Sequence, residues 1–126
     1  MKEKGSVRSL KQYNPIRKIR VALAGLWYCI VLDFSVSWKF FLSIVVLILA
    51  FLYEDSWVNF LFIMSVTALM IIAEMFNSVA EALCDLVQPE LDARVKVIKD
   101  MAAAAAGIAI FVWLFVLVHV LCEIFF

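Results

Sequence analysis

The chain has 126 residues, of which 67% are hydrophobic and only 17% are charged. A soluble domain is typically about half apolar, so this composition argues against one, and the length allows a single domain. Because 11 basic and 11 acidic residues cancel, a nucleic-acid binder driven by bulk charge is also disfavoured. The cysteines Cys29, Cys84 and Cys122 form no paired framework, which argues against disulfides and zinc.

The N-terminal segment is basic and then apolar. Seven of the 11 Lys and Arg residues lie in the first twenty positions, and no short apolar segment with a cleavage site follows, as a signal peptide would require. Residues 21–32 are apolar but few, and Asp33 follows them. We therefore expect residues 1–33 to form a basic segment and an amphipathic helix on the cytoplasmic membrane surface. A disordered basic tail and an early start to the first span is the alternative.

Three uncharged runs follow, at 40–53, 56–73 and 101–122, with His119 inside the last. A helix needs about 20 apolar residues to cross the ~30 Å hydrocarbon layer, and shorter runs can extend into their flanks. The runs predict membrane-spanning helices at about 36–54, 57–86 and 97–124. The expected fold is an all-α integral membrane protein, with residues 1–126 as a single domain.

The flanks of the runs predict the topology. Trp38 and Lys39 precede the first run and are typical of interfacial anchors. The first loop carries no Lys or Arg, whereas the second contains Arg94, Lys96 and Lys99. Because an excess of Lys and Arg marks the cytoplasmic side, we expect the N-terminus and the second loop to face the cytoplasm.

A polar face begins where the second run ends. Glu74, Asn77, Glu81 and Asp85 share one side of a helix at about 100° per residue. Three carboxylates on one face repel each other and are costly near lipid. Either Lys or Arg partners or a divalent cation with oxygen ligands would stabilise them, and magnesium would also bring in phosphates. The alternatives are a solvated helix end for Glu81 and Asp85, and a salt bridge from Glu74 to a neighbouring helix.

A second cluster precedes the third run. Lys96 and Lys99 are one turn apart, and Asp100 leads into an alanine run at 102–106. A lysine at this position can bind phosphate as a point charge, although ordinary anchoring at the cytoplasmic surface is an alternative. The small residues allow close helix packing, which favours oligomerisation.

These residues resemble the signature of the prokaryotic diacylglycerol kinase and undecaprenol kinase family. That signature is a Glu, two residues, Asn, three residues, Glu, three residues and Asp, with a later Lys-Asp pair that enters an alanine-rich helix. Here these residues are Glu74, Asn77, Glu81, Asp85, Lys99 and Asp100. The resemblance implies a homotrimer in the bacterial inner (cytoplasmic) membrane, with composite sites between subunits. It also implies ATP as co-substrate, Mg²⁺ as cofactor and a membrane lipid alcohol as acceptor.

The resemblance implies a role for each matching position. Glu74 matches the catalytic base, and Asp33 and Glu81 match the metal ligands. The implied nucleotide-binding residues are Asp33, Glu81, Glu90, Lys99 and Asp100, and Asn77 and Asp85 complete the polar face. The implied reaction converts diacylglycerol to phosphatidic acid, and phosphorylation of undecaprenol is the alternative.

The chain departs from the family pattern at several positions. Asp33 replaces the usual Glu, Leu91 and Asp92 follow Glu90 where an aromatic and a His are common, and the N-terminal nucleotide-contacting Arg and Tyr have no clear counterparts. Two alanines follow where some diacylglycerol-specific members carry Gly and Ser, which favours undecaprenol. A small proton or cation transporter subunit, with Glu74 as the ion carrier, is the alternative from another class. Such a transporter would not need the Lys99-Asp100 pair.

Overall fold

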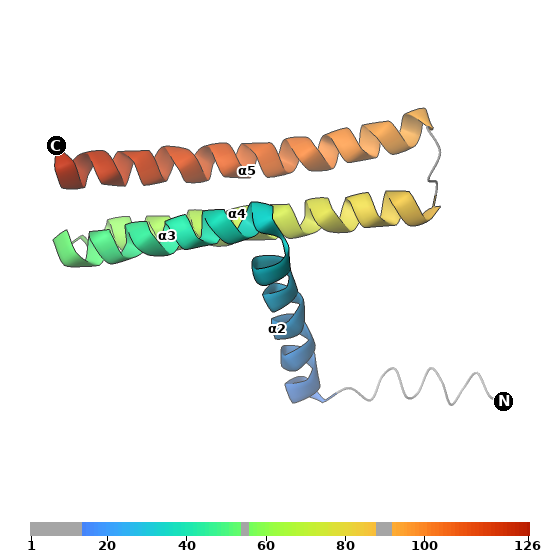
Figure 1. The fold of residues 1–126 in the computed structure, drawn as a ribbon, viewed down its shortest axis with the longest axis horizontal. Coiled ribbons are helices and arrows are strands. Elements are labelled where there is room, and N and C mark those ends of the chain that lie inside the picture. The colour runs from blue at the N-terminus through green and yellow to red at the C-terminus, as the bar shows by residue number, and fades with distance from the viewer. Residues whose placement is uncertain (1–13, 54–55, 88–91) are drawn as a thin grey trace. The chain divides into compact units, whose positions relative to one another are not determined.

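The computed structural model of the protein describes residues 14–53, 56–87 and 92–126. These ranges contain four α-helices and no strand (Figure 1). The helices are α2 (Pro15–Leu32), α3 (Phe34–Tyr53), α4 (Trp57–Val87) and α5 (Ala93–Phe125). The last three are each long and apolar enough to cross a membrane. The predicted all-helical fold with three candidate spans is therefore confirmed.

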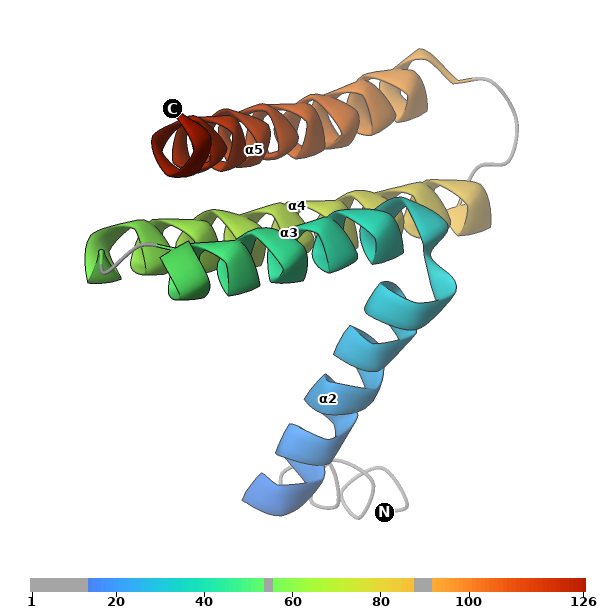
Figure 2. The same cartoon turned by 60° about the vertical axis from the view of Figure 1, so that its left-hand side comes forward.

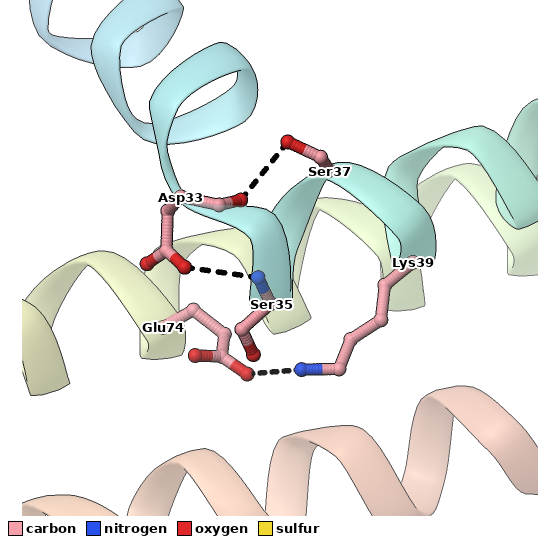
Figure 3. Close-up of polar contacts among 5 residues, drawn as sticks. All are labelled: Asp33, Ser35, Ser37, Lys39 and Glu74. Atoms are coloured by element: carbon pink, nitrogen blue, oxygen red, sulfur yellow. Dashed lines mark hydrogen bonds and ion pairs between the residues drawn. The ribbon is translucent and has the colours of Figure 1, made fainter.

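The chain divides into two units, residues 1–37 and 38–126. In the first unit, α2 begins where the Asn14 side chain accepts a hydrogen bond from Ile16 N at 3.2 Å and Pro15 occupies the first turn. The helix ends at Asp33, whose backbone is extended. Asp33 then caps the next helix, because its Oδ1 accepts from Ser35 N at 3.0 Å (Figure 3). The apolar segment at 21–32 is thus helical, and its place at the membrane surface stays a prediction.

The second unit contains α4, α5 and the part of α3 from Trp38 onward. α4 packs against α5, and α3 runs alongside α4 in both views (Figures 1 and 2). The buried interior consists of aliphatic side chains and one large aromatic. Its members include Val46, Ala50, Ile63, Met70, Trp113, Leu117 and Val120.

A short hydrogen-bonded chain joins α5 to α3 inside this unit. Trp113 Nε1 donates to Ser43 Oγ at 2.7 Å, and Ser43 Oγ donates to the Lys39 carbonyl oxygen at 2.9 Å. The Trp38 ring meets Trp113 edge-on, with centroids 6.2 Å apart. Polar groups buried in an apolar bundle need such partners, so this chain fixes how α3 lies against α5.

Replacing Trp113 with phenylalanine tests that chain of hydrogen bonds. The variant keeps an aromatic ring in the interior but removes the indole donor, so we expect the free energy of unfolding to fall by about 1 kcal/mol. Titration with a denaturing detergent, followed by circular dichroism, measures the change. The matched control is Trp57→Phe, because Trp57 is 75% exposed, and a change within about 0.5 kcal/mol is expected there. Equal losses in the two variants would contradict the prediction.

The third apolar helix begins at Ala93, earlier than the predicted start near residue 97. Asp92 is the reason, because its Oδ1 accepts from Arg94 N at 2.8 Å and caps the helix. The Arg94 side chain also donates from Nη2 to Asp92 Oδ2 at 3.1 Å. This side-chain hydrogen bond, and then the backbone one, lower the pKa of Asp92 below its ordinary value. The cap is therefore strongest when Asp92 is ionised.

This lowered pKa predicts a pH dependence of stability. Since the folded state holds Asp92 ionised more firmly than the unfolded state does, the added stability is present above the ordinary pKa of an aspartate. It is lost as pH falls through the lowered value. Asp92→Asn keeps a capping oxygen without the charge. The difference in unfolding free energy between wild type and variant should shrink from about pH 6 to about pH 3. A difference that does not change with pH would refute this account.

Candidate functional site

Glu74 of α4 is held in a buried ion pair with Lys39 of α3. Lys39 Nζ lies 2.6 Å from Glu74 Oε1, and the two side chains are only 6% and 8% exposed (Figure 3). A buried carboxylate needs such a partner, because removing a charge from water is costly. Of the arrangements that the sequence left open for Glu74, the structure has the salt bridge to a neighbouring helix.

Lys39 is therefore not the interfacial anchor that its place beside Trp38 suggested. Its side chain is buried, and Nζ lies 5.4 Å from the centroid of the Trp38 ring. A signal for the pairing was present in the sequence. Lys39 precedes one apolar run and Glu74 follows the next, and the ends of two antiparallel helices joined by a short turn lie opposite each other.

The remaining acids of the polar face lie toward the end where α4 stops and α5 begins, here called the loop end. Asp85 Oδ1 pairs with Lys99 Nζ at 2.9 Å, with side chains 67% and 41% exposed. Glu81 is exposed, and its charge also acts on Lys99. Asp100 pairs with Lys96 at 2.8 Å, one turn apart on α5. The loop end thus carries an exposed cluster of both signs.

The buried pair and the exposed cluster are separate within one chain. The helical rise of about 1.5 Å per residue puts Asp85 roughly 16 Å along the axis from Glu74. Lys99, which pairs with Asp85, lies at the same level. The structure therefore brings Asp85 and Lys99 together but does not bring Glu74 to either of them.

Asn77 lies between these two groups and has an unusual environment. Its Oδ1 is buried and accepts no hydrogen bond from the residues that the structure describes. An unpaired buried acceptor costs about 1–3 kcal/mol, so such an atom fits a position that a ligand completes. Glu81 lies about one turn further along α4 toward the loop end. Two oxygens of the kind that bind cations, one from each residue, therefore lie on consecutive turns of one helix face.

The oxygen atoms on this helix face can be compared with the ligands that a metal ion needs. Within 14–53, 56–87 and 92–126, no group of three or more His, Cys, Asp or Glu residues comes close enough to hold an ion. Magnesium often uses only one or two carboxylates and completes its shell with water and substrate phosphates. The Glu81 carboxylate and the Asn77 oxygen fit that kind of open site, and they do not fit a closed protein cage.

Two further residues were predicted for the site, Asp33 and Glu90. Asp33 belongs to the first unit, where one carboxylate oxygen caps α3. Glu90 lies outside the described residues.

The opposite end of the α4–α5 pair carries its own polar contacts. Asn59 Nδ2 donates to Glu123 Oε2, and His119 Nε2 lies 3.3 Å from Glu123 Oε1. A cavity of about 220 Å³ adjoins them, lined by Asn59, His119 and the apolar side chains of Phe62, Phe115, Val116 and Val120. The contact with Asn59 places Glu123 between α4 and α5, at the end of the pair away from the acidic face.

A comparison with known protein families matches most of the chain to one family. The family model described as prokaryotic diacylglycerol kinase matches residues 20–121. That range includes every candidate site residue, from Asp33 to Asp100. No curated protein and no solved structure matches the chain.

Proposed function

Because this chain belongs to the prokaryotic diacylglycerol kinase family, we propose that it transfers the γ-phosphoryl group of ATP to diacylglycerol and forms phosphatidic acid. The family implies a lipid kinase of the diacylglycerol or undecaprenol kinase type. The observation that carries the proposal is the family match over 20–121. The three apolar helices suit a multi-pass protein of a bacterial membrane, where the acceptor lipid resides.

In the proposed reaction, Glu74 is the general base. The lipid hydroxyl gives its proton to the Glu74 carboxylate as its oxygen bonds to the γ-phosphorus, and the bond to the bridging oxygen breaks to release ADP. A positioned base of this kind typically contributes about 10²–10⁴-fold in rate. Glu74 suits the role because it sits on a membrane-spanning helix in a largely apolar environment, where a lipid alcohol can approach.

We assign the nucleotide to the loop end. Glu81 and Asp33 would hold Mg²⁺, with the unpaired oxygen of Asn77 on the same helix face as Glu81. Bound Mg²⁺ would supply positive charge to the β- and γ-phosphates, as in other phosphoryl transfers. Lys99 adds a fixed cation. Its pair with Asp85 is partly exposed and therefore worth only about 0–1 kcal/mol, so Lys99 can turn to a phosphate at little cost. Glu90 and Asp100 are assigned to the nucleotide by family position.

A homotrimer with shared sites would bring the separated groups together. Within one chain Glu74 lies roughly 16 Å along the helix from the level of Lys99, which is too far for both to act on one phosphoryl group. A neighbouring subunit would supply the missing cation or acid. The outward apolar side chains of α5, such as Ile108, Phe111 and Phe115, suit packing against lipid or another subunit. Arg94, Lys96 and Lys99 lie at the loop end and favour a cytoplasmic location for it.

The direct test uses purified protein in mixed micelles with radiolabelled ATP and Mg²⁺. Parallel reactions contain diacylglycerol, undecaprenol or no added lipid, and a further set contains a chelator in place of free Mg²⁺. We expect labelled phosphatidic acid and no product with the chelator. Label in undecaprenyl phosphate alone would mean that the acceptor is undecaprenol and not diacylglycerol, and the protein would still be a lipid kinase. Label in neither lipid would overturn the proposed function.

A further inference from the structure

We infer that Lys39 is a positioning residue for the proposed reaction, holding one oxygen of the Glu74 carboxylate so that the other meets the lipid hydroxyl. The inference rests on the proposed function and goes beyond it, because it assigns a role to a side chain on α3. Figure 3 shows Lys39 and Glu74 reaching toward each other from two helices. Their contact joins Nζ to Oε1 at 2.6 Å.

The two oxygens of Glu74 have different surroundings. Oε1 accepts the charge-assisted hydrogen bond from Lys39, a type of bond that is short and roughly twice as strong as a neutral one. Oε2 accepts no hydrogen bond from the described residues, yet it is not among their fully enclosed unpaired atoms. Of the two oxygens, Oε2 is therefore the one that an incoming hydroxyl can reach.

Lys39 is itself held in place at two points. Its ammonium lies 5.4 Å from the centroid of the Trp38 ring, a cation–π distance that favours a desolvated cation. Its carbonyl oxygen accepts from Ser43 Oγ, which in turn accepts from Trp113 Nε1 on α5. A displacement of this turn of α3 would move Nζ away from Glu74. Three helices thus determine where the carboxylate lies.

An ion pair that only stabilises the fold predicts different kinetics from one that positions the Glu74 carboxylate. If Lys39 only balances a buried charge, activity should follow the amount of assembled protein. If Lys39 positions the base, assembled protein should turn over slowly while it binds ATP normally. The separation of kcat from KM for ATP therefore distinguishes the two roles.

The experiment compares Lys39→Met and Lys39→Arg with wild type in the micelle assay, using diacylglycerol or whichever lipid the wild type phosphorylates. We expect Lys39→Met to lower kcat by about 100-fold, with KM for ATP within about twofold of wild type. Lys39→Arg should recover most of the lost kcat, because it retains a buried donor to Oε1. Arg94→Met removes an exposed cation and should keep the wild-type kcat. Wild-type kcat in assembled Lys39→Met would overturn the inference.

A double-variant cycle tests whether Lys39 acts through Glu74. Once Glu74→Gln has removed the base, adding Lys39→Met should cause no further loss in single-turnover rate. A further loss as large as that of Lys39→Met alone would show that Lys39 acts elsewhere, which would overturn the inference. A wild-type protein that phosphorylates no lipid would instead overturn the proposed function, and this inference with it.

If Lys39→Met does not assemble, the Ser43→Ala variant tests the same inference. This variant buries no new charge, but it releases the Lys39 carbonyl and the Trp113 donor. We expect kcat to fall by about 3- to 10-fold, the equivalent of roughly one hydrogen bond, with KM for ATP unchanged. The control is Ser65→Ala, an exposed serine on α4, which should behave as wild type. An unchanged kcat in Ser43→Ala would overturn the inference.

Discussion

Glu74→Gln is expected to lower kcat for lipid phosphorylation by about 10²–10⁴-fold, the usual contribution of a general base. Glutamine has nearly the same size and still offers an oxygen to Lys39, but it cannot take a proton from the lipid hydroxyl. The assay is transfer of label from ATP to lipid at saturating ATP, with assembly checked by size-exclusion chromatography.

The matched control is Glu123→Gln, the same substitution at the other end of the α4–α5 pair. Glu123 contacts Asn59 and His119 and lies far from the acidic face, so the variant should keep the wild-type kcat. Near-normal phosphorylation by Glu74→Gln would remove Glu74 from the mechanism. Comparable losses in both variants would indicate a general effect of altered acids on the bundle.

Lys39→Met is expected to cause the largest loss of stability, about 3–5 kcal/mol in the free energy of unfolding. Methionine matches the lysine stem but leaves the Glu74 carboxylate buried without its partner. Unfolding in a denaturing detergent, followed by tryptophan fluorescence, measures the change. The double variant Lys39→Met with Glu74→Gln should regain most of the loss, because neither side chain is then charged.

The comparison for this prediction is Lys96→Met. Lys96 and Asp100 also form a lysine–carboxylate pair, but both side chains are well exposed, and such helix pairs are worth only about 0.3–0.5 kcal/mol. The loss of unfolding free energy should therefore be about tenfold larger in Lys39→Met than in Lys96→Met. Similar costs would mean that the Lys39 pair is well solvated.

The sequence predicted the helices well because long apolar runs constrain both length and environment. The runs at 40–53 and 101–122 each lie inside one helix of the structure, and the run at 56–73 does so from residue 57 onward. The spacing of Glu74, Asn77, Glu81 and Asp85 led to the family that the comparison confirms. These properties are local, since they depend on helix periodicity and on the order of residues along one element.

The pairing of charges was harder to predict because it depends on how the helices turn toward each other. The sequence allowed either basic partners or a cation for the acidic face. The structure gives lysine partners to Glu74 and Asp85. Lys39 was interpreted as an anchor because a lysine beside a tryptophan at the start of a span is common at the interface. Only the rotation of α3 about its axis decides between lipid interface and bundle interior. The catalytic and metal roles stay predictions.

The polar contacts at the two ends of the α4–α5 pair also limit how these helices can move. Asp85 meets Lys99 at one end, and Asn59 meets Glu123 at the other. A slide of one helix past the other by a single turn, about 5.4 Å, would break both contacts at once. We therefore expect α4 and α5 to keep their register along each other during turnover.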